Sequence, residues 1–497
     1  MNTLGKLLSH RAFVTPQNNA VEVGEKNYSY LELERKSNKI ARKLSAEFSK
    51  GDRIAILSPN DIDVPVLIYG CLKSGVVPVQ INWWIQPNEL TLLIPHAEIK
   101  AVYYSDPFSP IVEKGAADIP SKRIAELLKE VESLSDSFSE NIEAEDEAIQ
   151  IFTSGTTGIP KGIVLTHRNM VAMIRNISLD LPGMGYGQRS LVAIPLFNIA
   201  GAGYLFLTLG NGGTVILQKQ FDAAAFVELM SSHRITNIFL PPALVMAVMK
   251  AIPDAHSGFE HLELLHYGGA PMPGTLLKAA HHKFGCHLVQ GYGLTETSGI
   301  ISLLRASDHR RILNESANDL TIGSAGKPVV GMELKIVDEE SNEVQRGEIG
   351  ELHVRGESVI TSYWRNANPE AFEDGWLKTG DFVKQDEEGF LYILDRKNDM
   401  IISKGINVYP SEVEDVLNEH PKVDQVCVLG IESEEYGEMI CAAIIRKSAD
   451  LTDSELDTWS REHLSGYKIP RKWVFVDELP KNLAGKVVRK QLKINLK

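Results

Sequence analysis

The sequence predicts an α/β fold in two domains. A large N-terminal domain has parallel sheets covered by helices, and a smaller, mobile α+β domain follows it. Three observations lead to this prediction. The chain has 497 residues, more than one hydrophobic core normally serves. Short β-rich runs alternate with helical patterns along most of the chain, as in parallel sheets covered by helices. Near Asp395 the sequence becomes dense in charged residues, which indicates the end of the large domain.

The expected elements of the large domain follow one another regularly. The strands are expected at residues 53–57, 76–80, 191–195, 214–217, 237–241, 263–267 and 287–293. The helices between them are expected at residues 64–73, 223–233 and 273–284. No repeat of fixed period interrupts this order, so the pattern favours layered sheets over a solenoid.

The C-terminal domain is expected to start where the composition of the sequence changes. We place the two domains at residues 1–396 and 397–497. The second unit is expected to contain a helix from residue 411, strands at 426–430 and 439–446, and a helix at 454–464. Its length of roughly 100 residues is within the usual range for a domain.

Composition excludes several classes of function. The net charge of −14 argues against a general nucleic-acid or anionic-membrane binder, because such partners would be repelled. The four cysteines are scattered without a CxxC pair, so neither a disulfide framework nor a zinc site is expected. The first residues lack a signal-peptide pattern, and the longest apolar stretch, residues 199–217, contains glycines and Asn211. A cytoplasmic protein is therefore expected.

A phosphate-binding loop is expected at residues 153–162, TSGTTGIPKG, directly after the apolar run AIQIF. Small hydroxyl and glycine residues leave backbone N–H groups free to converge on phosphate oxygens, and a lysine adds charge. The residues expected to contact nucleotide are Thr153, Ser154, Gly155, Thr156, Thr157, Gly158 and Lys161. A flexible surface loop is the alternative, and a P-loop NTPase is excluded because GxxxxGK[ST] is absent.

This loop resembles the phosphate signature of the adenylate-forming superfamily: acyl-CoA synthetases, peptide-synthetase adenylation domains and firefly-type luciferases. Further segments resemble the other signatures of that superfamily, in its order. They are GYGLTET at 291–297, TGD at 379–381, Asp395-Arg396 with the segment after them, and PKNLAGK at 480–486. The type is closest to AMP-forming acyl-CoA synthetases of the fatty-acid–CoA ligase kind. The resemblance therefore implies activation of a carboxylic acid with ATP to acyl-AMP and pyrophosphate, then transfer of the acyl group to coenzyme A.

The resemblance also implies roles in the nucleotide site. Glu296 would hold Mg²⁺, which suits a hard cation that takes one carboxylate and phosphate oxygens, and Thr295 would contact the α-phosphate. Asp381 would accept both ribose hydroxyls, and Arg396 would add a donor. The residues expected around the adenine are Gly268, Gly269, Ala270, Gly291, Tyr292 and Gly293, with the tyrosine stacked on the base.

The C-terminal domain would supply the remaining chemistry. Lys486 would catalyse adenylation by bridging the carboxylate and the α-phosphate. By resemblance the small domain then rotates about Asn398, where relatives usually have Asp or Lys. Asparagine tolerates unusual backbone angles, so this position still suits a hinge. After the rotation Lys404 and Gly405 would line a tunnel for pantetheine.

The acyl pocket is expected near the segment PLFNIAGAG, with Phe197, Asn198, Gly201 and Gly203 as its residues. Asn198 replaces the histidine of the resembling pattern, so no proton transfer is assigned to it. No acidic residue lies between 197 and 203 to hold an α-amine. A fatty or aryl acid is therefore favoured over an amino acid. The adjacent Trp83 and Trp84 are expected to pack, one inward and one at the surface.

Two alternatives remain. The acyl group could pass to the phosphopantetheine of a carrier protein, whose thiol arm is the same as that of coenzyme A. From a different class, the chain could be an inactive acyl-binding protein. The joint presence of Lys161, Glu296, Asp381, Arg396 and Lys486 argues against that second reading. Neither the identity of the acid nor the oligomeric state can be read from the sequence.

Overall fold

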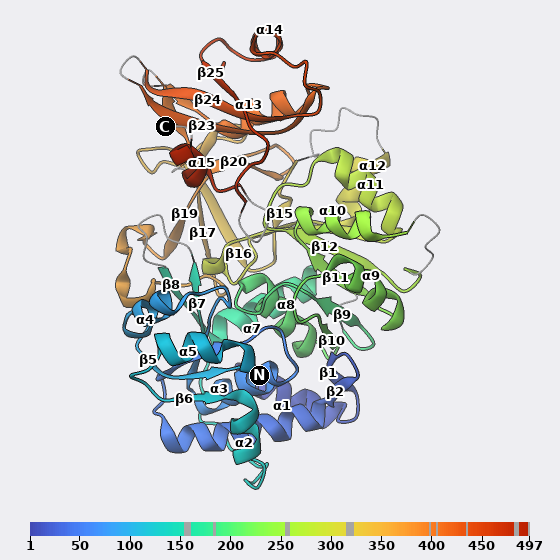
Figure 1. Ribbon diagram of the computed structural model, residues 1–497, viewed down its shortest axis with the longest axis vertical. Coiled ribbons are helices and arrows are strands. Elements are labelled where there is room, and N and C mark those ends of the chain that lie inside the picture. Colours follow the sequence, from blue (N-terminus) through green and yellow to red (C-terminus); the bar gives the residue numbers. More distant parts are fainter. Residues whose placement is uncertain are drawn as a thin grey trace.

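The structure is a computed structural model, and it describes residues 1–153, 161–181, 185–253, 259–314, 323–396, 399–403, 406–433, 436–481 and 487–495. Figure 1 shows a large N-terminal domain, in blue to yellow, below a smaller C-terminal domain, in orange and red. The predicted fold class is confirmed.

One sheet of the N-terminal domain has the strand order β6-β5-β3-β4-β7-β8. Its strands are β6 (Ser121–Arg123), β5 (Ile99–Tyr104), β3 (Arg53–Leu57), β4 (Val77–Gln80), β7 (Glu147–Thr153) and β8 (Lys161–Thr166). All neighbours are parallel except β7 and β8, which pair antiparallel. Every residue of β3 and β4 is buried, which explains the continuous apolar runs in the sequence.

A second sheet has the order β15-β14-β13-β12-β11-β9-β10-β1-β2. Its strands are β15 (Lys327–Pro328), β14 (Ser302–Leu304), β13 (His287–Tyr292), β12 (Leu264–Gly268), β11 (Asn237–Leu240), β9 (Arg189–Val192), β10 (Thr214–Leu217), β1 (Asn19–Val23) and β2 (Lys26–Ser29). The strands from β13 to β1 are parallel, and both ends of the sheet are antiparallel. The central strands are those expected from the sequence.

Helices cover both faces of this second sheet. One core contains buried residues of strands from both sheets and of α1 (Leu4–Val14), α2 (Tyr30–Glu47), α3 (Asp63–Ser74), α7 (His167–Asp180) and α8 (Ile199–Gly210). The opposite face packs on α9 (Ala223–Ser232), α10 (Pro242–Ala251) and α11 (Gly274–Phe284). The long apolar stretch at 199–217 is therefore the buried helix α8 followed by β10. Within the described residues no helix is long and apolar enough to cross a membrane.

A third sheet departs from the parallel pattern. It contains β16 (Met332–Val337), β17 (Ile349–Gly356), β19 (Trp376–Gln385), β18 (Phe372–Glu373) and β20 (Leu391–Arg396). Every neighbouring pair in it is antiparallel. Alternating apolar and polar residues indicate a strand but not its direction, so the sequence pattern does not distinguish this sheet from a parallel one.

The C-terminal domain forms a sheet in the order β22-β21-β24-β23, with β25 beside β24. Its strands are β21 (Ile401–Ser403), β22 (Ile406–Val408), β23 (Val423–Ser433), β24 (Gly437–Arg446) and β25 (Lys472–Phe475). The helices are α13 (Pro410–Asn418), α14 (Asp453–His463) and α15 (Arg489–Asn495). The expected small α+β unit is thus confirmed.

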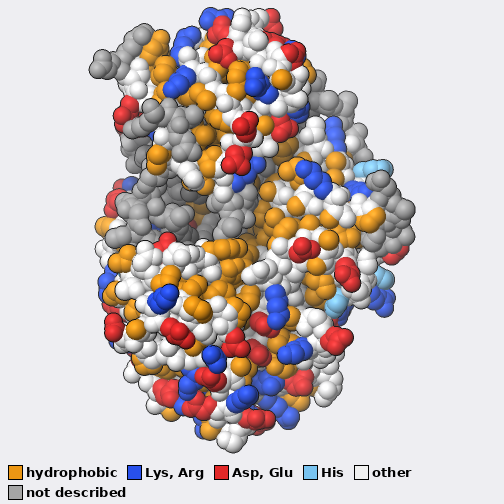
Figure 2. Space-filling model, viewed as in Figure 1, with side chains coloured by type: hydrophobic (Ala, Val, Ile, Leu, Met, Phe, Trp, Pro, Cys, Tyr) orange, Lys and Arg blue, Asp and Glu red, His pale blue; other side chains and the backbone are white. Residues whose placement is uncertain are grey.

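Short elements complete the chain. They are α4 (Pro87–His96), α5 (Ser109–Gly115), α6 (Ile124–Glu130), α12 (Ala306–Asn314), η1 (Asp106–Phe108), η2 (Thr295–Thr297), η3 (Trp364–Asn366) and η4 (Pro369–Ala371). On the face drawn in Figure 2, acidic and basic side chains are interspersed over the lower part of the molecule.

Candidate active site

Tyr363 joins two of the sequence motifs. Its hydroxyl donates a hydrogen bond to Glu296 Oε1 at 2.8 Å. The Lys161 ammonium lies 5.3 Å from the centroid of the same ring. Glu296 is in η2, after the end of β13, and Lys161 begins β8. The fold thus brings the lysine of the phosphate loop and the glutamate of the second motif to one aromatic side chain.

Hydrogen bonds from several elements hold the segment that carries Tyr363. Asn169 of α7 donates through Nδ2 to Val359 O at 3.1 Å, and the Ile360 N–H donates to Glu296 O at 2.9 Å. The indole of Trp364 donates to His96 O at 3.2 Å. These contacts come from different elements and hold the segment in place. Tyr363 can therefore fix the orientation of the Glu296 carboxylate.

A second contact links the motif at 291–297 to the motif at 379–381. The Tyr292 hydroxyl donates to Asp381 Oδ2 at 2.5 Å. Asp381 is buried, and its N–H donates to Thr379 Oγ1 at 3.1 Å. The Thr379 hydroxyl in turn donates to Leu352 O at 2.7 Å. Tyr292 is expected to stack on adenine, and here its phenolic end also orients the carboxylate expected to bind ribose.

Strand pairing places the hinge motif beside this carboxylate. Arg396 of β20 lies directly opposite Asp381 of β19 in the antiparallel ladder. Directly opposite residues have neighbouring side-chain positions on one face of a sheet. Asp395 accepts a hydrogen bond from the Ser411 N–H at 2.9 Å, and its Oδ1 lies 3.9 Å from Arg489 Nη1. Burial is the main reason that the pKa of Asp395 is raised to about 6. Asp395 therefore contacts the C-terminal domain directly.

The local backbone structure explains why glycines occur at the ends of β12 and β13. A Cβ on Gly268 would lie 2.4 Å from Gly291 O, and one on Gly293 would lie 2.4 Å from Gly299 O. Gly269 has φ +79°, a left-handed conformation that side chains disfavour. The close approach of neighbouring backbone thus already requires Gly268 and Gly293. Gly269 and the half-buried Ala270 follow at the strand end, where the base is expected.

The site fits a magnesium ion that is completed by ligands from the nucleotide. Glu296 is half-buried and presents one carboxylate, with Thr295 next to it. Among the described residues there is no cluster of three or more His, Cys, Asp or Glu that could bind a metal by itself. Mg²⁺ usually takes one or two carboxylates together with phosphate oxygens and water.

Phe197 packs away from α8. It is buried in a cluster with strands β3 to β5, and its ring centroid lies 5.0 Å from that of Trp83 and 5.8 Å from that of Trp84. Trp83 is 6% exposed and Trp84 is 47% exposed, as expected for one inward and one surface indole. Asn198 is exposed just before α8.

Gly201 and Gly203 differ in what surrounds them. A Cβ on Gly201 would lie 2.3 Å from Pro195 O, so this glycine lets the start of α8 approach the preceding turn. A Cβ on Gly203 would meet Met173 Cε at 3.7 Å, an ordinary contact. The packing of the turn therefore accounts for Gly201.

Several expected site residues lie outside the described part of the chain: Ser154, Gly155, Thr156, Thr157, Gly158, Asn398, Lys404, Gly405 and Lys486. The side chains of Thr153 and Arg396 are also outside it. Conversely, the sequence reasoning missed Tyr363. The one available signal was an aromatic pair, Tyr363-Trp364, within an otherwise polar segment.

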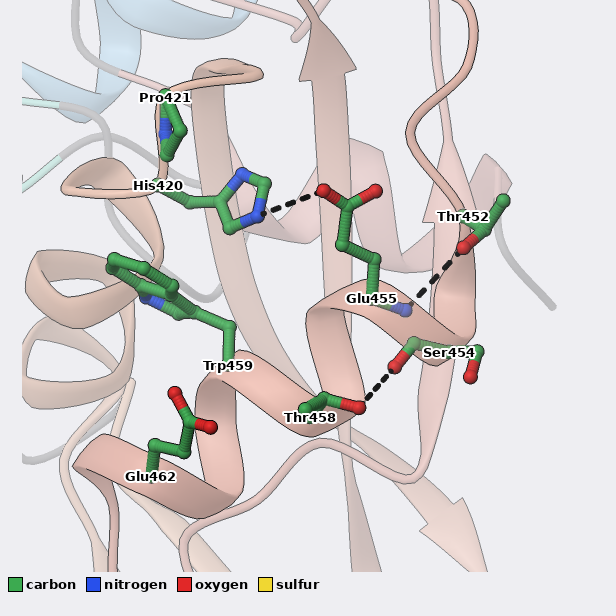
Figure 3. Close-up of a pocket in the computed structure, with 8 residues that line it drawn as sticks. All are labelled: His420, Pro421, Thr452, Ser454, Glu455, Thr458, Trp459 and Glu462. Atoms are coloured by element: carbon green, nitrogen blue, oxygen red, sulfur yellow. Dashed lines mark hydrogen bonds and ion pairs between the residues drawn. The ribbon is translucent and has the colours of Figure 1, made fainter.

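A pocket of about 510 Å³ lies within the C-terminal domain, away from these residues. Figure 3 shows its lining, in which His420 faces Glu455 and the Trp459 ring lies beside His420. His420 Nε2 lies 3.7 Å from Glu455 Oε1, and Thr452 accepts a hydrogen bond from the Glu455 N–H at the start of α14. These contacts stabilise the small domain and bring none of the expected site residues together.

Comparison with protein families finds a matching family model for each of the two parts of the chain. Residues 8–364 match the model of the AMP-binding enzyme, and residues 412–486 match that of the AMP-binding enzyme C-terminal domain. Relatives cover nearly the whole chain. A 2-succinylbenzoate–CoA ligase of Bacillus licheniformis is 34% identical over 98% of each chain. A long-chain-fatty-acid–CoA ligase of Salmonella typhimurium is 31% identical over 94% of this chain and 89% of its own.

Two further relatives extend the comparison. A fatty acid–[acyl-carrier-protein] ligase of Streptomyces coeruleorubidus is 30% identical over 99% of this chain and 96% of its own. The o-succinylbenzoate coenzyme A synthetase of Bacillus subtilis, solved with ATP and magnesium, has a TM-score of 0.85, with 31% identity over 98% of this chain and 99% of that one. On these matches, this chain belongs to the family of AMP-binding enzymes.

Proposed function

We propose that this protein is an AMP-forming acid–thiol ligase. It activates a carboxylic acid with ATP to an acyl-adenylate and pyrophosphate, and then forms the acyl-CoA thioester. The observation that carries the proposal is the contact of Tyr363 with both Glu296 and Lys161, at 2.8 Å and 5.3 Å. An acid and a phosphate are both anions, so the site must supply cations and positioned donors where they meet.

Each residue of the site has a separate role in binding the nucleotide or in catalysis. Lys161 and the loop before it hold the phosphates, and Glu296, oriented by Tyr363, faces them as the carboxylate for Mg²⁺. The ion, when bound, offsets phosphate charge. Asp381, oriented by Tyr292, accepts the ribose hydroxyls, with Arg396 opposite it in the ladder. Thr295 would contact the α-phosphate, and Lys486 would approach it from the small domain.

The division at residues 396 and 397 and the rotation about Asn398 belong to this proposal. The sheet of the large domain ends with β20 at Arg396, and the sheet of the small domain begins with β21 at Ile401. A short connection between two sheets is where few contacts need to break during rotation. Lys404 and Gly405 follow directly and would line the thiol's path. The cytoplasm is the proposed location, which four unpaired cysteines favour.

The acid is proposed to have an uncharged tail, either fatty or aryl. An amino acid would have to bury its ammonium group, and no acidic residue lies between 197 and 203 to pair with it. An unpaired buried charge costs several kcal/mol. We therefore expect ATP–pyrophosphate exchange to be faster with the best fatty or aryl acid than with any free amino acid. A panel of acids of varied length and ring content measures this directly.

The same panel identifies the acyl acceptor. AMP release should rise when coenzyme A is added, and should rise less with phosphopantetheinylated acyl carrier protein at equal thiol concentration. Faster AMP release with the carrier protein would show that the carrier protein, and not coenzyme A, is the acyl acceptor. Fastest exchange with a free amino acid would contradict the proposed substrate class, and no exchange with any acid would contradict the ligase itself.

A further inference from the structure

His266 is a buried histidine whose two ring nitrogens have no hydrogen-bond partner among the described residues. It lies on β12 and is 5% exposed. Within the described part of the chain, neither Nδ1 nor Nε2 makes a hydrogen bond. By contrast, the buried His309 lies 2.9 Å from the Tyr267 hydroxyl and 3.0 Å from Arg305 O, both within hydrogen-bond distance. A buried polar atom that makes no hydrogen bond costs about 1–3 kcal/mol, so native proteins seldom keep two on one side chain.

The position of His266 relates it to the proposed active site. It precedes Gly268 by two residues, roughly 7 Å along the strand, and β12 runs parallel to β13. A Cβ on Gly291 would lie 2.7 Å from His266 Nε2, so the imidazole is beside the first residue of the motif that carries Tyr292 and Glu296. In parallel sheets ligands bind beyond the carboxyl ends of the strands. His266 is therefore beneath the reacting centre.

Aromatic side chains surround the imidazole. The ring centroids of Phe239 on β11 and Tyr204 on α8 lie 5.2 Å and 6.2 Å from that of His266. Leu265 and Tyr267, the neighbours of His266 on β12, belong to the core on the other face of the sheet. His266 thus lies on the face of the sheet that α8 covers, on the side where the chain after Asn198 is expected to receive the acyl group.

The chemistry of the imidazole restricts what it could bind. Burial lowers the pKa of His266 to about 4, so the ring is neutral near pH 7. A neutral imidazole offers one N–H donor and one acceptor nitrogen. It suits a hydroxyl or a carbonyl oxygen, whereas a second carboxylate would require a cation.

We propose that His266 is a specificity-determining residue that hydrogen-bonds an uncharged hydroxyl or carbonyl group on the tail of the acid, away from the reacting carboxylate. This inference rests on the proposed function. A purely hydrocarbon acid would leave both ring nitrogens unpaired, whereas a hydroxyl or carbonyl oxygen on the tail would pair with one of them. A site built to hydrogen-bond its substrate discriminates strongly against the analogue that lacks the group.

Matched acids test the inference. ATP–pyrophosphate exchange is measured with octanoic acid and its hydroxy and oxo derivatives, scanned along the chain, and with phenylbutanoic acid against benzoylpropanoic acid. For the wild type, we expect kcat/KM to be about 10-fold or more higher for the best oxygenated member than for its hydrocarbon partner. His266→Leu should bring this ratio close to one, and His266→Gln should restore part of it.

The ratio between two acids is insensitive to a general loss of folded enzyme, because such a loss lowers both rates equally. Tyr267→Phe is the matched control: it alters the same strand on the opposite face and should leave the ratio unchanged. A wild type that prefers the hydrocarbon members throughout would overturn the inference, as would an unchanged ratio in His266→Leu. Either result would leave the ligase proposal intact. Absence of exchange with every acid would overturn both.

Discussion

Replacing Lys486 with alanine is expected to reduce acyl-AMP formation by on the order of 10²–10³-fold, while thioester formation from supplied acyl-AMP continues at nearly the wild-type rate. The lysine is expected to contact the carboxylate and the α-phosphate as charge develops between them. By the proposed mechanism, the small domain would present this lysine to the site only during the first half-reaction. The two half-reactions are measured separately, by pyrophosphate exchange and by acyl-CoA formation from synthetic acyl-AMP.

Lys481→Ala is the matched control for this variant. Lys481 lies in the same motif, and its ammonium donates to Gln425 Oε1 at 2.6 Å within the small domain. Its loss should leave both half-reactions close to the wild-type rate. An equal loss of both half-reactions in Lys486→Ala would show that the lysine maintains structure, or that the domain does not alternate.

Asn398→Pro is expected to give the opposite pattern. Proline fixes φ near −65°, so a hinge that must adopt two backbone states would be held in one. Asp395 contacts Ser411 and Arg489 across the connection, so the neighbouring backbone is already restrained in this arrangement. We expect acyl-AMP formation to survive and acyl-CoA formation from supplied acyl-AMP to fail.

The control for the hinge is Asn398→Ala, which removes the side chain but leaves φ free. It should retain most of both activities. Normal thioester formation in Asn398→Pro would show that the rotation is centred elsewhere, with Lys397 and Asp399 as the next positions to test.

The sequence predicted the parallel strands well because their apolar runs are short and bounded. The expected strand at 237–241 ends one residue earlier in the structure, at Leu240, where Pro241 and Pro242 stop the ladder. The antiparallel sheet around β17 and β19 was not anticipated. Its side chains alternate in the same way as those of any half-buried strand, so strand direction is decided by the chain connections and not by residue type.

The nucleotide site was predictable to the extent that it consists of contiguous motifs. Tyr292 and Asp381 are both motif residues, but the hydrogen bond between them depends on how two sheets pack. Tyr363 and His266 belong to no quoted motif, and their significance comes only from what surrounds them. Phe197 was expected to line the acyl pocket, and its ring contact with Trp83 was not anticipated. Sequence spacing specifies a face of an element only where that element is regular.

Transfer of oxygen from the acid to AMP tests the central proposal most directly. With the carboxylate labelled by ¹⁸O, attack on the α-phosphate must leave one labelled oxygen in the AMP after the acyl group passes to coenzyme A. We therefore predict AMP that carries a single ¹⁸O per turnover, with pyrophosphate unlabelled. Unlabelled AMP, or label recovered in inorganic phosphate with ADP as the nucleotide product, would contradict an acyl-adenylate intermediate.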